Sequence, residues 1–184
     1  MNNRQSIIII ALKLTTLKGL NNFRRNPNFY KSFAFFYIEL LAKVNKLSSC
    51  IELKQQDNNI LIVWNCTNTK IEDLIQFYRV LHTIRRKTNK AFVAFPIKYS
   101  IVVEFSSCNL LQLPFNNKAP KFLLESDMID RTQKVLSSLD GTSYPSIMFT
   151  HSFYELLPAS IKEFMNTPYY FFHICCYSIR KHSN

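Results

Sequence analysis

The stretch from Thr69 to Lys90 joins an apolar stripe to the densest positive charge in the chain. Apolar residues recur along it at intervals of three and four, which is the spacing of one helix face. Thr69 followed by Glu72 is a capping-box pattern, which is typical of a helix start. These features predict an amphipathic helix over about Lys70–Arg86, with one face packed on the protein and the other basic.

The whole chain is strongly basic, since 23 lysines and arginines stand against 12 acidic residues and give a net charge of +11 in 184 residues. A polyanionic partner is therefore expected, with nucleic acid first and an anionic membrane second. The basic run also fits a solvated helix face that binds nothing. The longest apolar runs fall short of the ~20 residues of a membrane-spanning helix, so no span is expected.

Glycine scarcity excludes several common enzyme motifs, because the chain has 2 glycines. A P-loop, a dinucleotide fingerprint and a nucleophile elbow all need more glycines than that. The histidines at 82, 151 and 173 are scattered, and no pair of carboxylates stands out. We therefore expect a protein that is not an enzyme.

The 5 cysteines contain no CxxC pair, which argues against a zinc finger and against a disulfide framework. His173, Cys175 and Cys176 could in principle hold a metal, but within an aromatic run they are interpreted as strand residues. No metal and no cofactor is assigned.

The predicted fold class is α+β, with an N-terminal α/β lobe of two helices and a β-hairpin and a smaller β-rich C-terminal lobe with short helices. Helices are expected at 6–20, 32–46, 70–86, 131–139 and 158–165, and strands at 50–54, 60–64, 147–150 and 169–178, with two more in 91–105 on either side of Pro96. The expected division is 1–90 for the first lobe, 91–130 for an insertion or connecting segment, and 131–184 for the second lobe.

The N-terminal region carries basic residues and no acidic residue before Glu39, as mitochondrial transit peptides do. We expect a mitochondrial matrix protein, encoded in the organelle, with no cleaved transit peptide.

The order of these elements resembles the bacterial-type small-subunit ribosomal protein eight family, in a diverged organellar form. Pro27, Lys31 and Ser32 stand where that family has a Pro-x-Ser-Lys element, and Arg79-Val80, followed after four residues by Arg85-Arg86, matches its basic spacing. Thr150 is retained from the family's C-terminal loop. The resemblance implies a strand near 71–80, in conflict with the helix that periodicity predicts.

The resemblance implies a structural component of an organellar small ribosomal subunit that binds rRNA and helps assembly. Its partners would be small-subunit rRNA and neighbouring ribosomal proteins, with no membrane and no small-molecule substrate. An accessory subunit of a mitochondrial respiratory complex is the alternative. The predicted RNA-binding residues are Arg24, Arg25, Lys31, Arg79, Arg85, Arg86, Lys87, Thr150, His151 and Ser152.

Overall fold

The computed structural model describes residues 4–16, 27–44, 50–56, 58–66, 71–109, 111–113, 121–123, 126–139 and 147–179. In chain order the elements are β1 (Arg4–Thr16), α1 (Pro27–Val44), β2 (Cys50–Gln56), β3 (Asn59–Asn65), α2 (Ile71–Ala91), β4 (Ile97–Asn109), β5 (Leu111–Leu113), β6 (Lys121–Leu123), α3 (Ser126–Ser138), β7 (Ile147–Thr150), α4 (His151–Glu155), α5 (Ala159–Lys162), β8 (Tyr169–Phe171) and β9 (Ile174–Tyr177).

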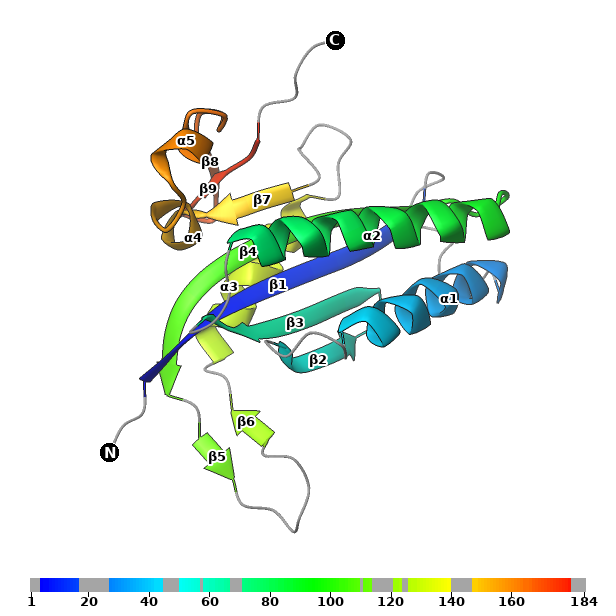
Figure 1. Cartoon of the computed structure of the whole chain (residues 1–184), viewed down its shortest axis with the longest axis horizontal. Coiled ribbons are helices and arrows are strands. Elements are labelled where there is room, and N and C mark those ends of the chain that lie inside the picture. Colours follow the sequence, from blue (N-terminus) through cyan, green and yellow to red (C-terminus); the bar gives the residue numbers. More distant parts are fainter. Residues whose placement is uncertain are drawn as a thin grey trace.

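The protein is α+β, as predicted, and is built on one mixed sheet of seven strands in the order β2-β3-β1-β4-β7-β9-β8. β4 and β7 run parallel, and the other neighbouring pairs are antiparallel. Helices α1 and α2 cover one face of the sheet and α3 lies on the other (Figure 1). β5 and β6 form a separate two-stranded pair. None of the described helices has the length and apolarity to cross a membrane.

The predicted helix over 6–20 is wrong, because residues 4–16 form strand β1 near the middle of the sheet. Every residue from Ile7 to Leu12 is buried. Ile8, Ile10 and Leu12 face α1 and α2, while Ile7 and Ile9 belong to the core under α3. A strand covered on both faces is apolar without alternation, so it offers apolar residues at helical spacing too, and its β-branched isoleucines favour the strand.

The predicted helix in the basic stretch is confirmed as α2, and the strand implied by the ribosomal resemblance is absent from these residues. Phe77, Leu81 and Ile84 are buried against the sheet. The Phe77 ring lies edge-on to the Trp64 indole of β3, with centroids 5.0 Å apart. The helix continues past its predicted end at Arg86 to Ala91.

The predicted helix over 32–46 is also present, but α1 begins earlier, at Pro27. Proline suits the first turn of a helix, because its missing N–H is not needed there. Ser32, where the predicted helix began, therefore lies inside α1, and its buried hydroxyl donates to the Phe29 carbonyl at 3.1 Å.

The segment expected to connect the lobes contains β4, which is one strand rather than the two predicted around Pro96. β4 pairs with β1 from Ile97 to Asn109 and with β7 on its other side. The predicted hairpin of β2 and β3 is confirmed, as is the predicted strand that forms β7.

The predicted closing strand is a hairpin of β8 and β9, whose turn residues Phe172 and His173 have φ angles of 47° and 66°. A residue with a Cβ is ~1–2 kcal/mol less stable in that left-handed region than in the right-handed helical region. We therefore expect Phe172→Asn with His173→Gly, the usual sequence for such a turn, to raise the free energy of unfolding by about 1–2 kcal/mol.

Chemical denaturation measures this gain, and Phe172→Ala with His173→Ala is the matched control, because it removes both exposed rings but puts no asparagine or glycine at the positive φ angles. A gain of equal size in the control would attribute the effect to the rings and not to the backbone conformation.

Candidate functional site

A cavity of about 110 Å³ lies between α3 and the edge of the sheet formed by β1, β2 and β3. Its walls are mostly aliphatic, and three polar side chains join them. The lining residues are Ala11, Lys54, Asn59, Ile60, Leu61, Ile129, Gln133 and Leu136. In its lining, apolar walls with a few polar groups, the cavity is similar to small-molecule sites.

Asn59 supplies an unsatisfied acceptor at this cavity. Its Oδ1 is buried and has no hydrogen-bond partner among the described residues. Buried polar atoms are nearly always paired, so this oxygen is available to accept a hydrogen bond from a group in the cavity.

The turn between β2 and β3 places Asn59 by docking on β1. The side-chain amide of Asn58 donates to the Leu14 carbonyl at 2.8 Å, and the Leu14 N–H donates to the Asn58 carbonyl at 2.9 Å. This pair of bonds holds Asn59 directly opposite Lys13 in the sheet. The short polar turn therefore sets the relative positions of the two side chains.

Lys13 belongs to the same face of the sheet as the cavity. It follows Ala11 by two residues on β1, and it is paired with Asn59 on one side and Ser100 on the other. Lys54 of β2 shares that face, because it pairs with Leu61, whose side chain belongs to the core under α3. We call Lys13, Lys54, Asn59 and Ser100 the open face, since among the described residues the core packed against α3 ends at Ala11 on β1.

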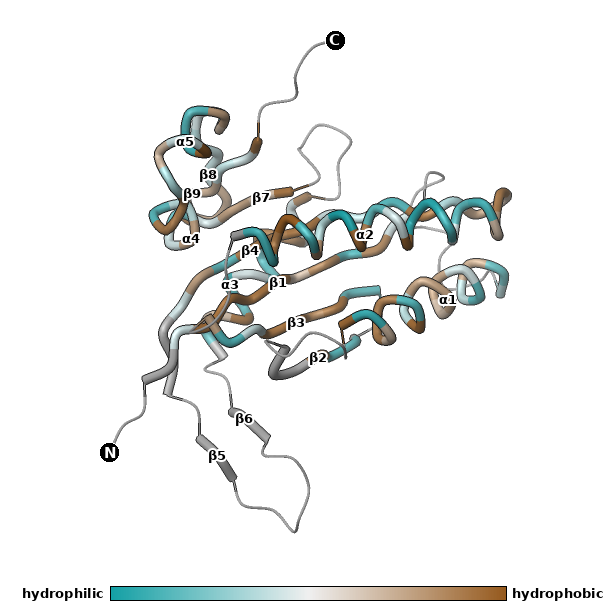
Figure 2. The backbone as a smooth tube through the Cα atoms, viewed as in Figure 1, coloured by the Kyte–Doolittle hydropathy of each residue, from teal (hydrophilic) through white to brown (hydrophobic). Residues whose placement is uncertain are grey.

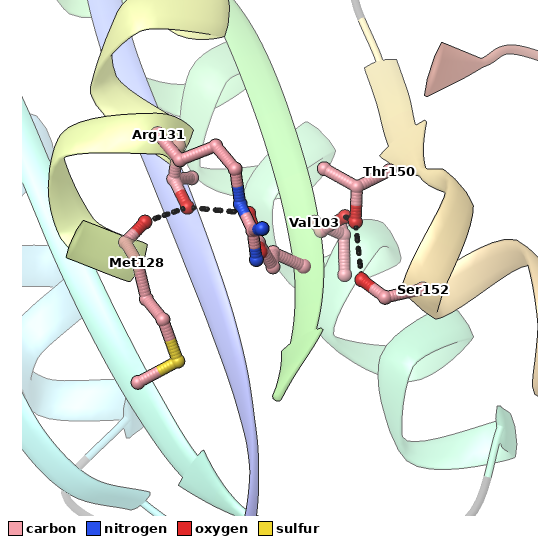
Figure 3. A network of polar contacts seen from close by, with 7 residues as sticks. Val103, Met128, Arg131, Thr150 and Ser152 are labelled. Carbon is pink, nitrogen blue, oxygen red and sulfur yellow. Dashed lines mark hydrogen bonds and ion pairs between the residues drawn. The ribbon is translucent and has the colours of Figure 1, made fainter. Parts of the chain in front are cut away.

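The buried carboxylate on this side of the sheet has a structural role. Glu104 is fully buried, forms an ion pair with Arg131 of α3 and accepts a hydrogen bond from the Thr132 hydroxyl at 3.0 Å. The Thr132 hydroxyl also lies 2.8 Å from the Met128 carbonyl (Figure 3). Glu104 therefore anchors α3 to β4.

No group of three His, Cys, Asp or Glu side chains that could hold a metal ion occurs in the part of the chain that the structure describes. Burial, followed by the neighbouring Cys175, raises the pKa of Cys176 to about 12. A thiol with that pKa stays neutral at pH 7 and is a poor nucleophile.

The structure separates the predicted RNA-binding residues. Arg24 and Arg25 lie outside the described residues. Lys31 is exposed on α1, and Arg79 is exposed on α2. The role predicted for them remains untested.

The compact basic cluster in α2 makes different contacts, although Arg85 and Arg86 line the same groove. Arg85 lies over the Tyr99 ring at 5.3 Å, and Lys87 pairs with Glu39 of α1 at 2.6 Å. Arg86 lines a groove at the end of the helix. Neighbours in the sequence therefore take part in different contacts, because successive helix positions are about 100° apart.

The predicted C-terminal loop is the junction of β7 and α4. Thr150 is buried, and its hydroxyl lies 3.4 Å from the Val103 carbonyl of β4 and 3.0 Å from the Ser152 hydroxyl (Figure 3). His151 is exposed, with its Nδ1 3.4 Å from the Tyr177 hydroxyl. The Thr150 hydroxyl thus faces the protein interior.

The sequence analysis missed the residues of the cavity and the open face. Lys13, Lys54, Asn59 and Gln133 come from four different elements. The adjacent asparagines at 58 and 59 are a local signal for a turn, which does not by itself indicate binding.

No protein-family model and no curated protein matches this sequence. Solved structures match it over nearly their whole length. The adenylyl cyclase CyaB from P. aeruginosa aligns with a TM-score of 0.66 and 10% identity, over 98% of this chain and 96% of that one.

Two further solved structures align in the same way. The dimeric guanylyl cyclase domain of the RhoGC fusion protein from Blastocladiella emersonii has a TM-score of 0.62 and 15% identity over 95% and 96% of the two chains. The guanylate cyclase domain of RhGC from Catenaria anguillulae, in complex with GTP, has a TM-score of 0.61 and 13% identity over 96% and 98%. At these identities the likeness establishes the fold.

These matches correct the resemblance to ribosomal protein eight, which is wrong. The chain has the fold of nucleotide cyclase domains over nearly all of its length. The predicted ribosomal function and the respiratory alternative are therefore wrong, and so are the predicted rRNA and ribosomal-protein partners. The expectation of a protein that is not an enzyme and binds no small-molecule substrate is contradicted as well. The resemblance failed because helix order and basic spacing recur in unrelated folds.

Proposed function

We propose that this chain binds a purine nucleoside triphosphate and cyclises it. The base occupies the cavity between α3 and the sheet, and the triphosphate lies across the open face. The neighbours named above, one of them in complex with GTP, support the class of ligand. The unpaired Asn59 acceptor is the observation in this chain that carries the proposal.

The cavity suits a flat heteroaromatic ring. Leu61, Ile129 and Leu136 offer apolar contact to ring faces. Asn59 and Gln133 carry amides, which can pair with the donor and acceptor edge of a purine, as amide side chains do with adenine in nucleic acids. An exocyclic or ring N–H that donates to Asn59 Oδ1 would satisfy that buried atom.

The open face suits the triphosphate. Lys13 and Lys54 supply ammonium groups, and the Ser100 hydroxyl lies beside Lys13 in the sheet. Ammonium groups neutralise phosphate charge and donate hydrogen bonds to phosphate oxygens.

In cyclisation the ribose 3′-oxygen attacks the α-phosphorus, the bond to the β-phosphate oxygen breaks, and pyrophosphate leaves. The 3′-hydroxyl proton passes to water. The lysines would stabilise the charge that gathers on the leaving pyrophosphate, and the cavity would hold the base so that the ribose and α-phosphate stay aligned.

Two substitutions test the assignment by comparing ATP and GTP with their nucleosides. We expect Lys13→Gln to weaken triphosphate binding about tenfold and to leave nucleoside binding unchanged, because it removes one charged contact. Asn59→Leu should weaken nucleoside and triphosphate binding alike, by about fivefold. Lys43→Gln on the exposed side of α1 is the charge-matched control.

Calorimetry measures binding, and chromatography of the reaction mixture detects the cyclic nucleotide and pyrophosphate. Failure of the unmodified chain to bind any purine triphosphate would refute the proposal. Binding of a triphosphate without formation of a cyclic product would refute the proposed cyclase reaction and support nucleotide binding alone.

Two expectations from the sequence are kept as proposals. The chain is located in mitochondria, and its lobes are 1–90 and 131–184, with 91–130 between them. Imaging of a tagged chain tests the first, and limited proteolysis at the two boundaries tests the second.

A further inference from the structure

A groove lies where α2 ends and β4 begins, away from the cavity under α3. Four of its lining residues are cationic and none is a carboxylate. The lining residues are Arg85, Arg86, Asn89, Lys90, Val93, Ile97 and Lys98. Its volume is about 470 Å³, which is room for an anionic group of the size of a lipid headgroup.

The turn beside this groove carries an apolar tip. The Phe95 N–H donates to the Phe92 carbonyl at 3.0 Å, so Val93 and Ala94 occupy the corners of the turn. Val93 is 78% exposed, and Ala94 is exposed as well. Polar residues, glycine and proline are usual at turn corners, so an exposed aliphatic tip is unexpected there. Figure 2 shows this tip as a hydrophobic end on a largely hydrophilic helix.

The tip is held rigidly. The Ile97 N–H donates to the Asn89 Oδ1 at 2.7 Å, and the Asn89 amide donates to the Ile97 carbonyl at 3.1 Å, which closes the base of the turn. The Phe92 ring packs edge-on against Phe35 of α1, with centroids 5.7 Å apart. The two phenylalanines beside the tip are partly buried, so the tip projects from a fixed base.

We propose that this tip and groove dock the protein on an anionic lipid surface. The cations would meet lipid phosphates while Val93 and Ala94 enter the boundary between headgroups and acyl chains. A nucleic acid or an inorganic phosphate would use the cations but would gain nothing from an exposed aliphatic corner. The combination of the two features therefore favours an anionic membrane, which the net charge of the chain had placed second, over nucleic acid.

The test is flotation of the full chain with phosphatidylcholine vesicles and with vesicles of equimolar phosphatidylcholine and phosphatidylglycerol. We expect binding to the anionic vesicles, weakened by salt, and none to the neutral ones. Each cation near such a surface is worth about a fivefold change in affinity, so Arg86→Gln with Lys90→Gln should weaken binding about 25-fold. Val93→Asp should weaken it about tenfold, since it removes apolar contact and adds a like charge to the surface.

Lys43→Gln with Lys134→Gln is the matched control, because it removes the same charge from exposed positions on α1 and α3. It should weaken binding far less than the groove variant. Circular dichroism of all variants shows whether a loss of vesicle binding comes from loss of folding. Nucleotide binding by the same variants shows whether the proposed nucleotide site is present independently of vesicle binding.

Three results would overturn the proposal. They are equal binding to neutral vesicles, equal losses in the groove and control variants, and a Val93→Asp variant that binds as well as the unmodified chain. Competition by single-stranded RNA combined with insensitivity to Val93 would assign the groove to nucleic acid instead.

Discussion

Arg131→Met should lower the free energy of unfolding by about 3 kcal/mol, because it leaves the carboxylate of Glu104 buried without its countercharge. Removing one partner of a buried ion pair usually costs about 3–5 kcal/mol. The lower figure applies because the Arg131 side chain is 46% exposed, so water reaches part of the pair. Urea unfolding followed by circular dichroism measures the change.

The double variant Glu104→Leu with Arg131→Met separates the stranded charge from lost packing. It removes both charges, and hydrophobic replacement of a buried pair is often neutral, so we expect stability within about 1 kcal/mol of the unmodified chain. In that variant the Thr132 hydroxyl can donate its hydrogen to the Met128 carbonyl, which lies 2.8 Å away. If the double variant were as unstable as Arg131→Met, the stability of this region would come from side-chain packing and not from charge pairing.

Trp64→Ala should cost about 3–5 kcal/mol, the usual range for deleting a fully buried tryptophan. Trp64 is 1% exposed and packs against Phe77 of α2, so its loss opens a cavity where α2 meets the sheet. It is the chain's 1 tryptophan, so circular dichroism and not intrinsic fluorescence must follow the unfolding.

Trp64→Phe should change stability by no more than about 1 kcal/mol. The indole Nε1 is buried with no hydrogen-bond partner among the described residues, and relief of such a donor is worth ~1–3 kcal/mol. That gain offsets the smaller apolar area of phenylalanine. A loss in Trp64→Phe as large as in Trp64→Ala would mean that the ring volume decides stability at this position.

Local pattern predicted α2 correctly and β1 wrongly for one physical reason. An amphipathic helix can be recognised in a sequence because only one of its faces is buried, so polar residues recur on the other face at a fixed interval. A strand buried on both faces has no polar face, and Ile7–Leu12 therefore fits a helix and a strand equally well by periodicity. Side chains of α1 and α2 bury one face of β1, and side chains of α3 bury the other. These helices lie outside the stretch of sequence that forms β1.

The candidate site was hidden from the sequence for a similar reason. Charge density drew attention to Arg85, Arg86 and Lys87, yet Arg85 and Arg86 line the groove at the end of α2 while Lys87 pairs with Glu39 of α1. Lys13 and Asn59 are 46 positions apart in the numbering and become neighbours through strand pairing. No local sequence pattern predicts which two residues become neighbours through the register of a sheet.

The amino-acid sequence by itself determined the α+β class, the helix of the basic stretch, the β2–β3 hairpin, the excess of positive charge and the absence of glycine-built motifs. These depend on local propensity, periodicity and composition, which each segment carries alone. Only the tertiary structure decided the strand order, the burial of β1 on both faces, the cavity with its unpaired Asn59 oxygen, and the cationic groove around Val93. Each of these arises from contacts between distant segments, whose free energy depends on the whole packed fold and not on any one stretch.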